Sequence, residues 1–195
     1  MKDALDRLIS GELPYILVGR DDLPEKTILL SGSFNPLHKG HEGLLLAAEK
    51  ASGREGILEL SVTNVDKPPL SIVELERRLL KMKGVYTVVL TCAPTFSEKA
   101  ELFPGAWFAL GYDTAIRLLS PDYPVDIPTM LERFRAMGTR FIVAGRLHED
   151  AFQTMENLHI PAGFEELFVP IPGTVFREDI SSTELRSGKL QGGNG

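Results

Sequence analysis

Residues 27–41 read TILLSGSFNPLHKGH, a short apolar run that leads through a glycine-containing turn to a pair of histidines. The run predicts a strand, and the residues from Gly40 onward predict a helix. A strand that passes through such a turn into a helix makes an anion site, because free backbone N–H groups and the positive end of the helix dipole point at the same place. His38 and His41 are three positions apart, so both imidazoles lie on the first helical turn and can donate to one phosphate. The stretch therefore predicts a phosphate-binding turn.

The same stretch follows the pattern G-x-F-x-P-x-H-x-G-H. Its fixed positions are Gly32, Phe34, Pro36, His38, Gly40 and His41. This pattern resembles the signature of the nucleotidyltransferase superfamily, whose members transfer AMP or CMP to small phosphorylated molecules. The resemblance implies ATP contacts from the residues Gly32, Ser33, Phe34, His38, Gly40 and His41, and a contact of Asn35 with the acceptor. On the residues alone, the alternative is a strand-to-helix turn in which the histidines only cap and pack.

The composition is that of an ordinary globular protein of one domain, with 195 residues, 43% hydrophobic and 25% charged. No apolar run is long enough for a membrane-spanning helix, and the N-terminus has no signal-peptide core, so we expect a cytoplasmic protein without a membrane partner. The single cysteine, Cys92, excludes a disulfide framework and is interpreted as a buried strand residue rather than a nucleophile. A net charge of −6 argues against nucleic acid as a partner. The oligomeric state is left open, a homo-oligomer included.

Short apolar runs alternate with helical patterns along the chain. The predicted strands are 27–31, 57–63, 87–92, 106–110, 140–145 and 167–171. The predicted helices are 40–51, 71–82, 113–119, 128–137, 151–157 and 182–189. Near-continuous apolar strands between helices predict an α/β fold with a doubly wound, mainly parallel, Rossmann-like sheet that has helices on both faces. Ligands of such sheets bind beyond the carboxyl ends of the strands, where the motifs of this chain fall.

The ends of the chain differ from this domain. Leu5, Leu8 and Ile9 are spaced as one face of a short N-terminal helix. We expect residues 1–26 to form that helix and a linker, residues 27–190 to form the nucleotidyltransferase domain, and residues 191–195 to be a disordered tail. The sequence assigns no role to residues 1–26.

A second motif lies near the C-terminus, where residues 179–186 read DISSTELR. Hydroxyls and backbone N–H groups at a helix start can bind phosphate oxygens, and Arg186 adds a cation one turn later. Ser181 and Glu184 also form the pattern of a capping box, which is compatible with anion binding. The segment resembles the closing ATP-phosphate motif of nicotinamide or nicotinate mononucleotide adenylyltransferases. The resemblance implies ATP contacts from Ile180, Ser181, Ser182, Thr183 and Arg186.

Residues that could contact a nucleotide occur at two further places in the chain. Lys67 follows the second strand, where the resemblance implies contacts to phosphate and acceptor; a solvated loop lysine is the alternative. Gly111 and Asp113 follow the strand 106–110 and resemble the Gly-x-Asp that contacts the adenosine ribose in the family. A glycine permits close approach of a ligand, and a carboxylate can accept from two hydroxyls. The alternative is that Asp113 only caps the next helix.

Four weaker candidates for the acceptor site complete the set. Thr95 and Phe96 follow the third strand, in the region that lines the pyridine pocket of the mononucleotide enzymes. Trp107 can stack on a ring, although a core tryptophan in a strand fits its position better. Arg146 follows the fifth strand and can contact phosphate or substrate. His148 and His159 have no partner at a recognisable spacing and are interpreted as surface residues.

The resemblance implies attack of an acceptor phosphate on ATP with release of pyrophosphate. A phosphate oxygen is already ionised at neutral pH, so no general base is required, and catalysis depends on positioning and charge stabilisation. His38, His41, Lys67 and Arg186 are the residues expected to act on the transferring phosphates. Mg²⁺ is expected to arrive with the triphosphate, held by phosphate oxygens and water, since no zinc-like spacing of histidine and cysteine occurs.

Several members of the superfamily fit the chain. The opening GSFNP, the Gly-x-Asp and the closing ISSTxxR favour nicotinamide or nicotinate mononucleotide as acceptor. The Lys-Pro-Pro segment at 67–69 looks as much like the phosphopantetheine enzymes. A cytidylyltransferase that uses CTP and a nucleotide sensor without catalysis are further alternatives. Class I aminoacyl-tRNA synthetases share the histidine motif, but the short acidic chain has no matching lysine loop or RNA-binding region.

Overall fold

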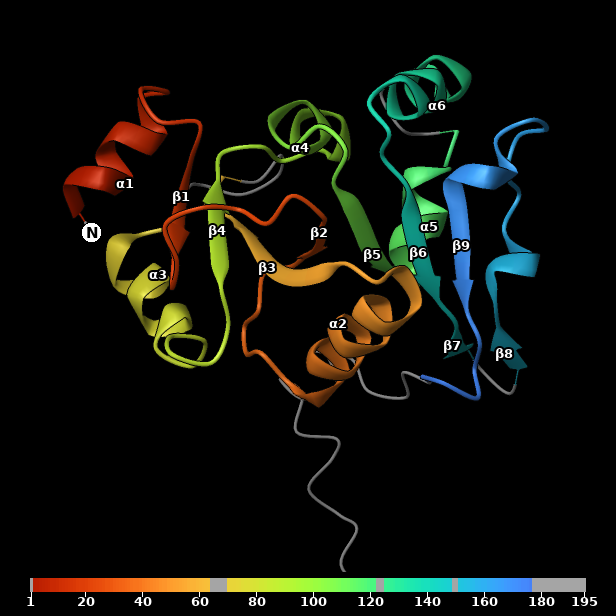
Figure 1. The fold of residues 1–195 in the computed structure, drawn as a ribbon, viewed down its shortest axis with the longest axis horizontal. Coiled ribbons are helices and arrows are strands. Elements are labelled where there is room, and N and C mark those ends of the chain that lie inside the picture. The colour runs from red at the N-terminus through yellow and green to blue at the C-terminus, as the bar shows by residue number, and fades with distance from the viewer. Residues whose placement is uncertain (1, 64–69, 122–124, 149–150, 177–195) are drawn as a thin grey trace, which may run out of the picture.

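A computed structural model describes residues 2–63, 70–121, 125–148 and 151–176 of the chain (Figure 1). Seven strands form one sheet in the order β1-β4-β3-β2-β5-β6-β9. Their bounds are β1 Tyr15–Val18, β2 Thr27–Ser31, β3 Glu55–Ser61, β4 Val88–Thr91, β5 Trp107–Gly111, β6 Phe141–Ala144 and β9 Phe168–Ile171. All neighbouring strands are parallel except β1, which pairs antiparallel with the edge of β4.

The strand order reverses direction between β2 and β5. From β2 the chain builds outward through β3 to β4, and it then returns to β5 and builds the other way through β6 to β9. The parallel strands therefore have the arrangement of a doubly wound sheet, as the sequence predicted. In such sheets the crevice at the carboxyl ends of the two central strands is the usual ligand site.

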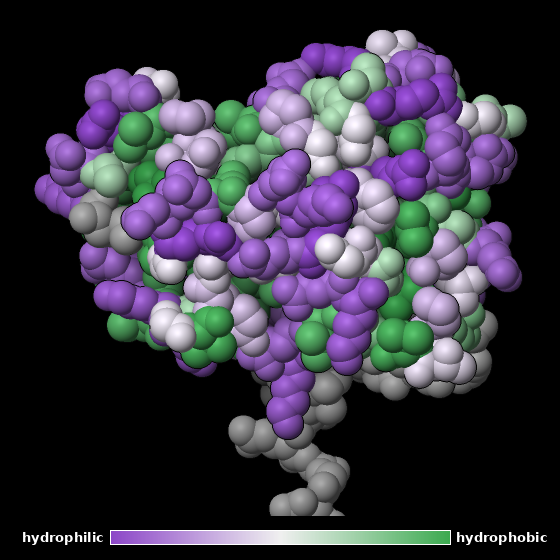
Figure 2. Space-filling view, viewed as in Figure 1, coloured by the Kyte–Doolittle hydropathy of each residue, from purple (hydrophilic) through white to green (hydrophobic). Residues whose placement is uncertain are grey.

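Helices cover both faces of the sheet because successive strand residues point to opposite sides. On one face a buried cluster joins α1 (Lys2–Ile9), α2 (Lys39–Ser52) and α3 (Ile72–Leu79) to residues such as Leu30, Leu60 and Leu90. On the other, α4 (Phe96–Leu102), α5 (Tyr112–Leu118) and α6 (Ile127–Ala136) pack on residues such as Phe108 and Phe141. The face of the molecule seen in Figure 2 is largely hydrophilic, with apolar patches between the polar side chains.

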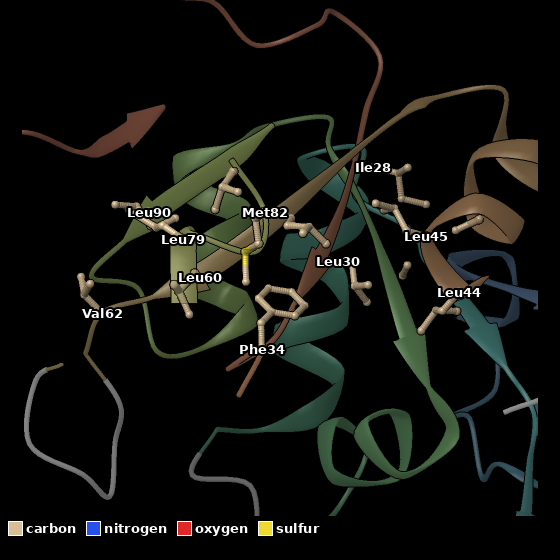
Figure 3. Close-up of a cluster of buried hydrophobic side chains, with 14 of the residues drawn as sticks. Ile28, Leu30, Phe34, Leu44, Leu45, Leu60, Val62, Leu79, Met82 and Leu90 are labelled. Carbon is tan, nitrogen blue, oxygen red and sulfur yellow. The ribbon is translucent and has the colours of Figure 1, made fainter. Parts of the chain in front are cut away.

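The first of these clusters also contains Phe34 from the predicted phosphate-binding turn. Figure 3 shows its ring among Leu30, Leu60 and Met82, and only 1% of the residue is exposed. The turn is thus anchored in the core by an aromatic side chain. This anchoring fixes where the chain enters α2.

Most of the predicted elements are confirmed to within a few residues, and four points need correction. Residues 1–26 contribute the strand β1 as well as a helix. The segment 151–157 is not helical: β8 (Ala151–Gln153) pairs with β7 (Arg146–His148) as a hairpin, and a 3₁₀ turn follows at Met155–Asn157. The helix α4 was not predicted. Ile9 is 46% exposed, whereas Leu5 and Leu8 are buried.

Two sequence expectations lie outside the described residues, the helix at 182–189 and the tail at 191–195. Cys92 directly follows β4 and is half-buried, and burial raises the pKa of its thiol. Within the described ranges, no helix has the length and apolar character needed to cross a membrane.

Candidate functional site

The predicted phosphate-binding turn lies at the reversal point of the sheet. It leaves the carboxyl end of β2, and Gly111 ends the neighbouring strand β5. The first motif residue, Gly32, donates from its N–H to the carbonyl of Glu59 at 3.0 Å, so the turn remains paired with β3 as it leaves the sheet. Two motifs that the sequence places far apart are thus brought to one edge.

The two histidines form a capping box at the start of α2. His38 is the N-cap, and its Nδ1 accepts from the N–H of Gly40 at 3.2 Å. The Nδ1 of His41 accepts in turn from the N–H of His38 at 3.3 Å. Because both Nδ1 atoms accept hydrogen bonds, the neutral ring of each residue carries its proton on Nε2. The capping alternative and the phosphate alternative are therefore compatible, since capping uses Nδ1 whereas a phosphate would accept from Nε2–H.

The same arrangement keeps the histidines uncharged. Burial, and to a lesser degree the neighbouring His38, together lower the pKa of His41 to about 4. Burial also lowers the pKa of His38, although Glu42 opposes that shift. The ring centroids are 3.7 Å apart, so two positive charges would repel strongly. At neutral pH the pair therefore offers neutral N–H donors rather than cations.

Gly32 is required at the start of the turn for a steric reason. A Cβ at this position would lie 2.8 Å from the Phe34 ring, which is closer than van der Waals contact allows. Phe34 itself has a left-handed backbone, with a φ of 43°, and its ring meets that of His41 edge-to-face at 5.1 Å. The glycine lets the aromatic ring fold back under the turn, and the ring in turn supports the histidine.

Helix α3 contributes two residues that sequence reasoning did not assign. Arg78 donates from Nη1 to the carbonyl of Ser33 at 2.8 Å, and Arg77 donates from Nη2 to Oδ1 of Asn35 at 2.5 Å. Both guanidinium groups also bind Glu74, and these hydrogen bonds lower the pKa of the Glu74 carboxyl to about 2. The phosphate-binding turn is thus held from outside by α3. The available signal was the pair of adjacent arginines in the last turn of α3, but their targets in the turn lie more than 40 residues away in the sequence.

At the carboxyl ends of β5 and β6 the structure joins two predicted site residues. Arg146 forms an ion pair with Asp113, which lies in the first turn of α5 just after Gly111. The sequence placed Asp113 at the ribose and Arg146 at the acceptor, with no contact between them. Their pairing orients the carboxylate and offsets the charge of each. The alternative that Asp113 only caps the helix is not supported, because the N-cap of α5 is Gly111.

The weaker acceptor candidates separate into two groups. Thr95 lies at the site edge as the N-cap of α4, in a capping box with Glu98. The ring of Phe96 instead packs edge-to-face on Phe108 and Phe141 in the core. Trp107 starts β5, at the opposite end of the strand from Gly111, so the structure does not bring it to the site.

Trp107 has other partners at that opposite edge. The guanidinium carbons of Arg54 and Arg140 lie 4.4 and 5.3 Å from its ring centroid. The expectation of a core strand tryptophan fits better than that of an acceptor contact, although the residue is only partly buried.

Several predicted residues lie outside the described part of the chain. They are Lys67, Ile180, Ser181, Ser182, Thr183 and Arg186. The last described residue, Phe176, packs against Gly43 in the second turn of α2, where a Cβ would lie 2.5 Å from its ring.

In the described ranges no three His, Cys, Asp or Glu side chains converge as metal ligands.

Comparison with known proteins agrees with this geometry. A family model described as cytidylyltransferase-like matches residues 29–188, which is most of the chain. A protein of Schizosaccharomyces pombe named "Putative nicotinamide mononucleotide adenylyltransferase" is 30% identical over 134 residues. That alignment covers 61% of this chain and 53% of the relative, so the chain spans about half the length of the relative it matches.

Proposed function

The chain belongs to the cytidylyltransferase-like family, and from this premise we propose that it transfers AMP from ATP to a mononucleotide with release of pyrophosphate. The acceptor is nicotinamide or nicotinate mononucleotide. The observation that carries the proposal is the pair of neutral histidines that cap α2 at the reversal point of the sheet. The relative's name, which specifies nicotinamide mononucleotide, supports the choice of acceptor.

In this proposal the reaction needs positioning and charge stabilisation rather than a base. The acceptor phosphate attacks the α-phosphorus of ATP, a P–O bond forms to the acceptor, and the bond to the departing pyrophosphate breaks. The Nε2–H groups of His38 and His41 donate to α- and β-phosphate oxygens. Their neutral state suits this role, because two uncharged donors can lie side by side without repulsion.

Other residues act on the remaining charges of ATP. Lys67 and Arg186 offset negative charge, and the hydroxyls at 181–183 bind the outer phosphates. Asp113, oriented by Arg146, accepts from the ribose hydroxyls. Mg²⁺ arrives with ATP and is held by phosphate oxygens and water.

In this proposal the acceptor lies between the turn after β2 and the loop after β4. There it contacts Asn35, whose side chain accepts from Arg77, and Thr95, the N-cap of α4. The proposal assigns Thr95 to the acceptor and assigns no contact to Phe96 or Trp107.

Pyrophosphate release tests the proposal directly. Purified protein is incubated with Mg²⁺-ATP and, separately, nicotinamide mononucleotide, nicotinate mononucleotide or phosphopantetheine. We expect release with a mononucleotide and formation of the dinucleotide product. Release only with phosphopantetheine, or only when CTP replaces ATP, would move the chain to another acceptor or nucleotide. ATP binding without any release would identify a nucleotide sensor instead.

A further inference from the structure

Glu59 makes contact with three parts of the site edge at once. Its carbonyl accepts from the N–H of Gly32, the first residue of the phosphate-binding turn. Its Oε1 accepts from the hydroxyl of Thr91, the last residue of β4, at 2.6 Å. Its Oε2 lies 3.1 Å from the Nζ of Lys99 on α4. The residue therefore links the exit of β2, the exit of β4 and the following helix.

This ion pair lies inside the protein. Glu59 is fully buried in the middle of β3, and Lys99 is 6% exposed. Moving two charges out of water costs several kcal/mol per ion, and well-packed apolar residues of similar volume are often as stable or more stable. Fold stability alone therefore gives no reason for the pair. A buried pair does differ from an apolar contact in one respect, which is that it admits only one arrangement of the groups it joins.

The elements joined by the pair frame the connection from β4 to α4. The hydroxyl of Thr91 also accepts from the N–H of Ala93 at 3.3 Å, and Ser61 donates to the Ala93 carbonyl at 3.0 Å. Thr95 then caps α4, and the N–H of Lys99 donates to the Thr95 carbonyl at 3.1 Å. Lys99 is thus one helical turn from Thr95, and its ammonium group fixes that turn to the centre of the sheet.

We propose that the buried Glu59–Lys99 pair positions the acceptor side of the site by fixing Thr95 and the 92–95 loop relative to the phosphate-binding turn. This inference rests on the proposed function, in which Thr95 contacts the acceptor. Glu59 and Lys99 are positioning residues and touch neither substrate. ATP recognition, which depends on residues of the turn and of β5, is not part of their role.

The test uses the double variant Glu59→Gln/Lys99→Met, which removes both charges and retains an acceptor for Thr91. The matched control is Glu101→Gln/Arg133→Met. It removes an ion pair that also involves α4 but is exposed to solvent and joins the helix to α6. Steady-state kinetics are measured separately for ATP and for the mononucleotide, and amide hydrogen exchange is followed at residues 92–99.

We expect the buried double variant to raise the KM for the mononucleotide, with a fall in kcat/KM of about 10- to 100-fold, because small displacements near a reacting group have effects of this size. The KM for ATP stays near the wild-type value. Amide exchange at 92–99 becomes faster while exchange in α2 does not change. The exposed control behaves as wild type in all three measurements.

Two results would overturn the inference. One is unchanged exchange at 92–99 in the buried double variant, and the other is faster exchange with an unchanged KM for the mononucleotide. If the wild-type protein turns over no mononucleotide, the proposed function fails, and the exchange measurement still decides whether the pair positions the loop.

Discussion

The exits of β2 and β4 lie at the same edge of the sheet but are held by different kinds of contact. The turn after β2 is organised largely by its own residues, since His38 and His41 cap the helix that they begin, and Phe34 packs on Gly32. The connection after β4 depends on Glu59, a residue from another strand, buried in the sheet. The conformation after β2 is therefore encoded locally, whereas that after β4 depends on residues distant in the sequence.

The largest effect that would sharpen this contrast is expected from Lys99→Met alone. It leaves the Glu59 carboxylate buried without its cation, and breaking a buried pair in this way costs about 3–5 kcal/mol of unfolding free energy. Urea unfolding monitored by circular dichroism measures the loss. The double variant with Glu59→Gln recovers most of the stability. If the single and double variants are equally stable, the pair is not coupled in the way that the geometry indicates.

The second largest effect is expected from a substitution in the turn after β2. His41→Ala removes a preorganised donor to the transferring phosphates, and we expect turnover to fall by about 10²- to 10³-fold. His159→Ala is the matched control, because it removes an exposed imidazole distant in sequence from the site. Circular dichroism of both variants reports whether the fold is retained. Near-normal turnover in a folded His41→Ala protein would contradict the role of the turn.

Because His41 has a lowered pKa, we expect the free energy of unfolding to fall with pH between about 6.5 and 4. The pKa of His41 is about 4 in the folded protein and 6.5 in an unfolded chain, so below pH 6.5 the unfolded state binds a proton that the folded state does not. Unfolding free energy therefore decreases as the pH falls from 6.5 to 4, by up to about 3 kcal/mol, and this contribution is constant below 4.

Comparison of wild type with His41→Asn isolates that contribution. The decline between pH 6.5 and 4.5 should be shallower in the variant, because Asn does not titrate. This window lies above the acid range in which Glu74, with its pKa of about 2, takes up a proton. Identical slopes in the two proteins would show that His41 is not the titrating group.

A smaller effect is expected from Arg78→Met, which removes the support that α3 gives to the turn. The lost hydrogen bond joins a guanidinium group to the Ser33 carbonyl, and bonds to charged groups contribute about 1.5–3 kcal/mol. We expect kcat/KM for ATP to fall by roughly 10-fold, at the low end of that energy, because the carbonyl stays partly solvated. Arg77→Met, at a more exposed residue, is the matched comparison and should have less effect on ATP. An unchanged kcat/KM in Arg78→Met would show that the turn is self-supporting.

Much of the fold could be predicted from the sequence because strand and helix periodicity is a local property. The parallel strands and α2 are found within a few residues of their predicted positions. The errors have local causes too. Tyr15–Val18 is a short edge strand of four residues. In the segment predicted as a helix at 151–157, Ala151–Gln153 pairs as a hairpin with Arg146–His148, and Met155–Asn157 forms a 3₁₀ turn.

The contacts of the candidate site were likewise predictable where they are local in the sequence and not where they are distant. The two histidines, Gly32 and Phe34 were predicted from adjacent residues, and the structure brings them together. The contacts of Arg78 with the turn, of Arg146 with Asp113, and of Lys99 with Glu59 were not predicted. Each joins elements whose separation in the chain carries no information about their distance in space.

The strand-to-helix turn with its two capping histidines follows from the sequence alone, because a helix cap involves only a few neighbouring residues. The sequence also determined the alternation of strands and helices that gives a doubly wound sheet. The ion pairs Lys99–Glu59 and Arg146–Asp113, in contrast, depend on the tertiary structure. Side-chain partners across the sheet depend on strand order and register, and a single residue of register reverses the face on which a group such as Glu59 is buried.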